Sequence, residues 1–316
     1  ANHFKTEHFE QVMNAGDIRW SLPKLVYHLE DLRVGMSYPN YYISRLASKF
    51  VKVCLQGTGG DELFGGYPWR YYKVFDSLNR EQFFNQYYEF WQRLVPDSDK
   101  EELFTKEVFD KVDIDEPRKV FERVFTFNKK LKYDTPEEHI NNSLYFEIKT
   151  FLPGLFLVGD KLAMAHGLEE RFPFMDNDLV DFAMKVPVKH KLGNLEKEIE
   201  RIDENVEKKK KVYREFDDGK NVLRKAMSDF IPEAIVNRKK QGFSAPDESW
   251  YRGENAEYVK ELLLSNDTVS TKYIKKEYIH KVVDEHINKG VNHRLLIWSF
   301  MNFEWWCKIF INGEKI

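Results

Sequence analysis

The sequence predicts an α/β fold that is mostly helical and contains only part of a parallel sheet. A short apolar run rich in β-branched residues, 51–55, ends in a glycine-rich loop. Buried parallel strands commonly deliver such a loop to a site at their carboxyl ends. From about residue 80 to residue 147, Phe and Tyr recur at helical spacing. The last of these features, a stretch rich in Trp and Phe over 294–310, predicts a buried terminal helix.

The remaining elements follow from apolar periodicity and from helix starters and breakers. Pro39 stands where a helix would begin, and we expect breaks near Pro96, near Pro136 and at the Pro-Gly pair 153–154. Aromatic residues in the helical part predict core packing rather than a ligand site. The predicted elements outside 80–147 are an extended piece over 9–12 and helices over 18–29, 41–50, 161–167, 179–184, 221–230, 254–264, 275–288 and 294–310.

A highly charged stretch, 191–220, contains few apolar anchors and ends in an Asp-Asp-Gly turn. We expect it to form a mobile insert on the surface. Its lysine run, 208–211, could bind an anionic partner, although charge runs are usually solvated faces.

Composition narrows the class of protein. The 316 residues carry 49 basic and 52 acidic side chains, a net charge of −3, which provides no overall field to attract nucleic acid. Cys54 and Cys307 suggest neither a disulfide framework nor a metal site, so we expect buried free thiols in a reducing compartment. No run approaches the ~20 apolar residues of a membrane helix, and no signal-peptide core is present. The expectation is a cytoplasmic protein without a membrane or nucleic-acid partner.

The most informative segment is Q-G-T-G-G-D-E-L-F-G-G-Y, residues 56–67. Glycines directly after a strand let the backbone approach a ligand and present N–H groups to negative oxygens. Asp61 and Glu62 add hard oxygen ligands suited to Mg²⁺. The combination suits a nucleotide with its metal ion, and the alternative is a tight strand-to-helix turn with a capping Asp.

This string resembles the S-G-x-G-x-D-E-x-F-G-G-Y motif of the asparagine synthase family and its β-lactam synthetase relatives. Residues 160–176, D-K-L-A-M-A-H-G-L-E-E-R-F-P-F-M-D, resemble the family's D-K-x-x-M-A-x-x-x-E-x-R-x-P-F-L-D signature. Residues 220–226 resemble K-x-x-L-R-x-A, and 238–243 resemble R-x-K-x-x-F. The matches stand in the family's order and span about residues 25 to 250.

The resemblance implies a fold of the adenine-nucleotide α-hydrolase type, also called ATP pyrophosphatase. It implies a parent enzyme that uses ATP and Mg²⁺ to adenylate a carboxylate, by default aspartate, and transfers ammonia from a glutaminase domain to it. One alternative is a related amidotransferase acting on another acid in polysaccharide or secondary metabolism. Another is a catalytically silent interaction module.

The resemblance also implies roles for residues at matching positions. Lys240 matches the catalytic lysine, Lys220 a lysine facing the phosphates or the intermediate, and Thr58 a position that often carries a catalytic acid or Tyr. The structural alternative for the acceptor block is an ion-pair cluster of Glu170, Arg171 and Asp176, and His166 is expected to be a packed helix residue. The expected site comprises Lys240, Lys220 and Thr58 for catalysis, Gln56, Gly57, Gly59 and Gly60 for the nucleotide, Asp160, Glu170 and Arg171 for the acceptor, and Asp61 for the metal.

Two departures and two absences qualify these roles. Gln56 stands where the family usually has Ser, and Thr58 cannot act as a carboxylate base. No stretch matches the family's S-G-G-x-D-S pyrophosphate loop, and the amidotransferase half with its N-terminal cysteine is missing, which Cys54 in a strand cannot replace. We therefore expect a synthetase domain over 1–316, cut short on its N-terminal side and inactive alone.

Overall fold

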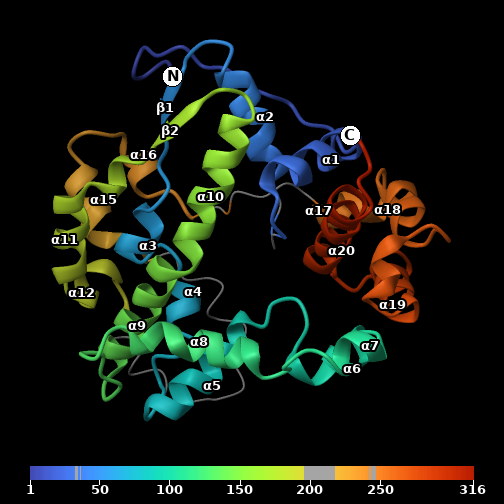
Figure 1. Cartoon of the computed structure of the whole chain (residues 1–316). Helices are drawn as coiled ribbons and strands as arrows, with labels where there is room; N and C mark the ends of the chain where they lie inside the picture. Colours follow the sequence, from blue (N-terminus) through green and yellow to red (C-terminus); the bar gives the residue numbers. More distant parts are fainter. Residues whose placement is uncertain (33–34, 36, 196–217, 241, 243–246) are drawn as a thin grey trace.

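The computed structural model describes residues 1–32, 35, 37–195, 218–240, 242 and 247–316 (Figure 1). Most of the predicted insert, 196–217, therefore lies outside the described residues. The described ends of that segment meet each other, because the backbone N–H of Gly193 donates to the carbonyl oxygen of Asp218 at 3.0 Å.

The sheet consists of two short parallel strands, β1 (Val53–Leu55) and β2 (Glu169–Arg171). Their register pairs Cys54 with Glu170, and the strands bring together the two longest motifs of the sequence. One face of the sheet is open, since Leu55 is 73% exposed and Val53 41%. The predicted class, a mostly helical α/β fold with part of a parallel sheet, is confirmed in the part of the chain that the structure describes.

Helix α10 (Phe151–Met164) packs against β2 and corrects one prediction. The Pro-Gly pair at 153–154 does not break the chain but lies in the first turn of this helix. A proline is tolerated there because the first backbone N–H groups of a helix have no intrahelical partner. The helix therefore begins well before the predicted range of 161–167.

The N-terminal and C-terminal helices form one core. Helix α1 (Asp17–Leu29) packs on α2 (Tyr38–Ala47), on α10 and on the terminal helix α20 (Arg294–Trp306). Trp298 is fully buried there, as the terminal Trp-rich pattern predicts. Helices α17 (Asp247–Arg252), α18 (Ala256–Leu263) and α19 (Lys276–Asn288) complete this core. None of the described helices is both long and apolar enough to cross a membrane.

A second core is almost entirely aromatic. It lies between α5 (Arg80–Trp91), α8 (Glu116–Thr126) and α9 (Pro136–Lys149), at the bottom of Figure 1. The predicted role of these aromatic residues as packing is confirmed by the buried rings of Phe83, Tyr87, Phe121, Phe125 and Phe146. Two short helices, α6 (Lys100–Leu103) and α7 (Lys106–Phe109), extend to the right of it.

Short helix α3 (Gly60–Phe64) follows β1 and contacts α9, α11 (Asn177–Lys185) and α15 (Asn221–Met227). The glycine-rich motif thus lies where these separate segments meet. Three further short helices pack on helices already named: α4 (Pro68–Tyr71) contacts α9, and both α12 (Val188–Lys191) and α16 (Glu233–Val236) contact α15.

Candidate active site

The loop between β1 and α3 holds the predicted nucleotide glycines in two different environments. Gly59 has a φ of +102°, and a Cβ on it would lie 2.4 Å from Cε of Met175. A Cβ on Gly60 would lie 3.2 Å from the ring of Phe174. These two glycines let the 173–175 turn pack on the loop, whereas Gly57 has open space at its Cβ position. Of the three, Gly57 is therefore the one that a ligand could approach directly.

Asp61 forms ion pairs with both predicted catalytic lysines. Its Oδ1 lies 2.9 Å from Nζ of Lys220, and its Oδ2 accepts a hydrogen bond from Nζ of Lys240 at 2.7 Å. Burial alone would raise the pKa of Asp61, but the two ammonium groups together hold it below its ordinary value. Three sequence motifs thus converge on one carboxylate.

Backbone contact brings Lys220 to this place. A Cβ on Gly219 would lie 2.3 Å from the carbonyl oxygen of Gly65, so only glycine permits this approach of two loops. The N–H of Lys220 donates to the carbonyl oxygen of Phe64 at 3.1 Å, and α15 begins at the next residue. Lys220 itself has a left-handed φ of 59°, which is uncommon for a residue with a side chain.

Gly66 fixes the direction of the Asp61 side chain. Its N–H donates to the carbonyl oxygen of Asp61 at 2.7 Å, and a Cβ on it would lie 1.9 Å from Oδ1. The carboxylate therefore occupies the space that any other residue at position 66 would fill.

The surroundings of Asp61 do not fit the expected Mg²⁺ site. Both carboxylate oxygens already face ammonium groups, and Glu62 is buried, with its Oε1 accepting a hydrogen bond from the Tyr67 hydroxyl at 3.0 Å. Within the described ranges no three His, Cys, Asp or Glu side chains lie together as a metal site would require. One carboxylate beside two cations does not hold Mg²⁺ by itself.

A second cluster surrounds Glu170. Gln56 donates from Nε2 to Oε1 of Glu170, and the Thr58 hydroxyl donates to Oε1 of Gln56 at 3.3 Å. The other oxygen, Oε2, is buried without a hydrogen-bond partner among the described residues, and a Cβ on Gly159 would lie 2.4 Å from it. Burial, assisted by Asp160, raises the pKa of Glu170, while Gln56 lowers it.

The structural alternative for the acceptor block is wrong in its pairing. Arg171 is exposed and pairs with Glu169, with Nε 2.8 Å from Oε1. Asp176 instead caps α11 by accepting hydrogen bonds from the N–H groups of Asp178 and Leu179. Arg171 therefore does not pair with the Glu170 carboxylate. Asp160 is exposed and acts on Glu170 through its negative charge.

His166 lies in the turn after α10, with its ring 4.5 Å from that of Tyr41. Burial lowers its pKa, which disfavours a charged histidine. A packing role is consistent with this position, although His166 follows the helix rather than lying inside it.

Comparison with known proteins agrees with the motifs now assembled in space. The sequence profile described as asparagine synthase matches residues 1–308. The chain belongs to the asparagine synthase family. The fold of this family is the adenine-nucleotide α-hydrolase-like type that the motifs predict.

Several curated relatives are similar to this member of the asparagine synthase family. Glutamine-hydrolyzing asparagine synthetase 1 of Bacillus subtilis (strain 168) is 27% identical over 344 aligned residues, covering 98% of this chain and 48% of the relative. A putative asparagine synthetase of Mycobacterium tuberculosis (strain H37Rv) is 23% identical, covering 98% and 47%. An amidase, chry2, of Gibberella zeae is 25% identical, covering 48% and 20%. The chain spans about half the length of the first two.

Tyr67 is the last residue of the asparagine synthase motif, and the sequence predicts no role for it. Its ring lies under two cations, with its centroid 3.8 Å from Cζ of Arg70 and 5.3 Å from Nζ of Lys240. Arg70 also pairs with the fully buried Glu147. In the sequence, Arg70 is marked only by its position three residues beyond the motif, and no pattern in the sequence indicates Glu147.

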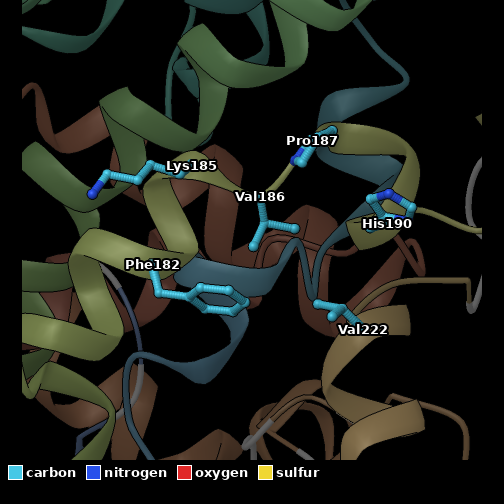
Figure 2. Close-up of a pocket in the computed structure, with 6 residues that line it drawn as sticks. All are labelled: Phe182, Lys185, Val186, Pro187, His190 and Val222. Carbon is cyan, nitrogen blue, oxygen red and sulfur yellow. The ribbon is translucent and has the colours of Figure 1, made fainter.

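An open pocket of about 260 Å³ is lined by residues of α11, α12 and α15 and of the segment between the first two (Figure 2). It contains none of the residues expected to be functional in this asparagine synthase family member, and its walls are mostly apolar. The lining residues are Phe182, Lys185, Val186, Pro187, His190 and Val222.

Proposed function

We propose that the parent of this chain is an ATP-dependent amidoligase. Its synthetase domain adenylates a small carboxylate, with aspartate as the default acceptor, and a glutaminase domain supplies ammonia from glutamine. The B. subtilis relative is named a glutamine-hydrolyzing asparagine synthetase, and the M. tuberculosis relative a putative one. We expect this enzyme to be located in the cytoplasm, with neither nucleic acid nor a membrane as a partner.

One observation carries this proposal: Lys220 and Lys240 converge on Asp61 beside the glycine-rich loop. In adenylation, a carboxylate oxygen of the acid attacks the α-phosphorus of ATP, and the bond from that phosphorus to the bridging oxygen of the β-phosphate breaks. Negative charge then grows on the departing pyrophosphate. Two ammonium groups fixed at this place would stabilise that charge in the transition state.

The second step needs no further cofactor. The nitrogen of ammonia attacks the acyl carbon, and the acyl–oxygen bond to AMP breaks as the amide forms. Glu170 is half-buried, and its buried Oε2 is unpaired among the described side chains, which makes it the candidate to contact the acceptor or to receive a proton from the attacking nitrogen. Asp160 and Arg171 are exposed and would contact the acceptor at the edge of the site.

We expect ATP as the nucleotide, contacted by Gln56, Gly57, Gly59 and Gly60. Of these, Gly57 has the open space for direct contact. Mg²⁺ would have to arrive with the phosphates, because both oxygens of Asp61 face ammonium groups and Glu62 is buried against the Tyr67 hydroxyl. No step above depends on the metal.

A second candidate is an amidotransferase of the same family that acts on a different carboxylate. The contact of Gln56 with Glu170 favours it, because this non-family residue occupies one oxygen of the acceptor-block carboxylate. The match to a protein named amidase chry2 supports the view that related chains carry different activities. The third reading, a catalytically silent module, is disfavoured by the joint presence of Asp61, Lys220 and Lys240.

Pyrophosphate release by the full-length parent tests these readings. We expect release that depends on ATP and on one acid, with an amide product that appears when glutamine or ammonia is present. Aspartate as that acid supports the first candidate, and another acid from a panel supports the second. No acid-dependent release with any acid, from a folded parent, would support the silent module.

A further inference from the structure

The ring of Tyr67 is fixed at two points. Its hydroxyl donates to Glu62 at 3.0 Å, and the guanidinium of Arg70 lies 3.8 Å from the ring centroid. Nζ of Lys240 lies over the same ring at 5.3 Å. Cations are attracted to the faces of aromatic rings, most strongly where water is excluded. Tyr67 thus contacts the predicted catalytic lysine directly.

Arg70 is held from behind by the helical part of the fold. Its side chain is 8% exposed and pairs with the fully buried Glu147 of α9, with Nη1 3.2 Å from Oε1. Its Cζ also lies 4.5 Å from the ring centroid of Phe151 and 5.3 Å from that of Trp91. Helices α5, α9 and α10 therefore each contribute one contact to this guanidinium.

Glu147 is itself held in place. The hydroxyl of Tyr71 donates to its Oε2 at 3.2 Å, and the hydroxyl of Tyr87 lies 3.5 Å from its Oε1. A buried ion pair contributes little net stability compared with apolar side chains of similar volume. The better explanation for this charged pair among aromatic side chains is that Glu147 holds the Arg70 side chain in one conformation.

We propose that Arg70 is a positioning residue: held by Glu147, it fixes the Tyr67 ring, and the ring together with Asp61 fixes Nζ of Lys240. The importance of this for catalysis rests on the proposed function, in which Lys240 meets the departing pyrophosphate. The positioning of the Lys240 amine does not depend on the proposed function. It gives the aromatic helical part of the fold a role at the site beyond packing.

The test measures how fast each lysine amine of this chain reacts with an amine-acylating reagent, with the sites located by peptide fragmentation in a mass spectrometer. Exposed Lys239 is the unprotected reference. Lys161, which is partly buried and bonded to Glu30 and Leu29, reports any general loosening. The variants are Tyr67→Leu, Tyr67→Phe, Arg70→Met, and Arg70→Met combined with Glu147→Leu.

We expect Lys240 to react on the order of tenfold faster in Tyr67→Leu and in Arg70→Met, while Lys161 stays protected. Tyr67→Phe keeps the ring and should retain most of the protection. If Arg70→Met alone fails to fold because Glu147 is left unpaired, the double variant removes both charges and should fold. Arg118→Met is the matched control, since Arg118 lies 5.1 Å over Tyr88 and pairs with Glu122 away from the site.

Two results would overturn the proposal. The first is a Lys240 rate that stays within about twofold of wild type in the folded double variant and in Tyr67→Leu. The second is a rise of Lys161 and Lys240 together in every variant, because that shows a structural role only. Neither result bears on whether the parent is an amidoligase, so failure of the proposed function is distinguished by the pyrophosphate assay.

Discussion

Nζ of Lys240 lies 2.7 Å from Oδ2 of Asp61, although 179 positions separate the two residues in the chain. The other oxygen of the same carboxylate lies 2.9 Å from Nζ of Lys220. Each lysine therefore has a fixed place relative to the other, and each can be tested without removing the anchor. The neighbouring Lys239 is exposed and supplies a matched comparison.

Lys240→Ala should lower kcat for pyrophosphate release by the parent enzyme by about 10² to 10³, because it removes a charge acting mainly in the transition state. Its melting temperature should change little, since Asp61 keeps Lys220. Lys240→Arg should not restore full activity, because a planar guanidinium is not a compact point charge. Equal rates in Lys240→Ala and wild type, or a larger loss in Lys239→Ala, would remove Lys240 from the mechanism.

Gly66→Ala should destabilise the chain by about 1 to 3 kcal/mol, because the new Cβ would occupy the position of Asp61 Oδ1. The measurement is chemical denaturation. Gly57→Ala is the matched control for stability, since its Cβ would meet no atom within 4 Å. Equal destabilisation by both substitutions would show that the carboxylate moves aside without cost.

Glu147 should make stability depend on pH. Burial, only partly offset by Arg70, raises its pKa from 4.5 to about 7. The folded state therefore holds this proton more tightly than the unfolded state. The contribution of Glu147 to the free energy of unfolding is thus complete below about pH 4.5 and is lost as the pH rises through 7. Relative to Glu147→Gln, the wild-type free energy of unfolding should fall by on the order of 2 kcal/mol from pH 5 to pH 8.

Denaturation curves for wild type and Glu147→Gln across that pH range make the comparison. Glu137→Gln, at an exposed position in the same helix, is the control and should follow wild type. Parallel curves for wild type and Glu147→Gln would contradict the raised pKa.

Gln56→Ala should lower the free energy of unfolding by about 1 to 3 kcal/mol, because it removes a hydrogen-bond donor from the half-buried carboxylate of Glu170. The cost should be larger at pH 8 than at pH 5, since Gln56 stabilises the ionised form of Glu170 and holds its pKa down. Thr58→Val is the control and loses only a neutral hydrogen bond of 3.3 Å. A cost that does not change with pH would argue that Glu170 remains protonated throughout.

This chain alone should bind ATP with Mg²⁺ weakly, with no saturable heat in calorimetry at sub-millimolar ATP. Much of the binding of a triphosphate comes from backbone donors such as those of a pyrophosphate loop, and none of its sequence matches S-G-G-x-D-S. A tight one-to-one isotherm would contradict this expectation.

Sequence periodicity predicted much of the fold but not all of it. The predicted helices at 18–29 and 275–288 closely match α1 and α19, because each presents a regular apolar stripe to the core. Strand β2 was not predicted, since Glu169–Arg171 carries only charged residues and is a strand through its pairing with β1. The extended piece at 9–12 forms no strand.

The site was predictable where a motif carried it. By family resemblance Asp61 was expected to bind the metal and Lys220 and Lys240 to act in catalysis, and the structure brings the three side chains together as ion pairs. The contact of Gln56 with Glu170 was not predictable, because it depends on the register of two strands more than 110 positions apart. The same holds for Glu147, which looks like any polar residue on a helix until its neighbours are known.

The two ammonium groups at Asp61 bring their own counterion with them. An anion that arrives at this place must displace a tethered carboxylate that is always present at the same effective concentration, so its affinity is measured against an internal competitor rather than against water. Weakly charged anions would lose that competition, whereas a group bearing several negative charges could replace both contacts at once. Selectivity for polyanions can therefore arise here without any residue that recognises their shape.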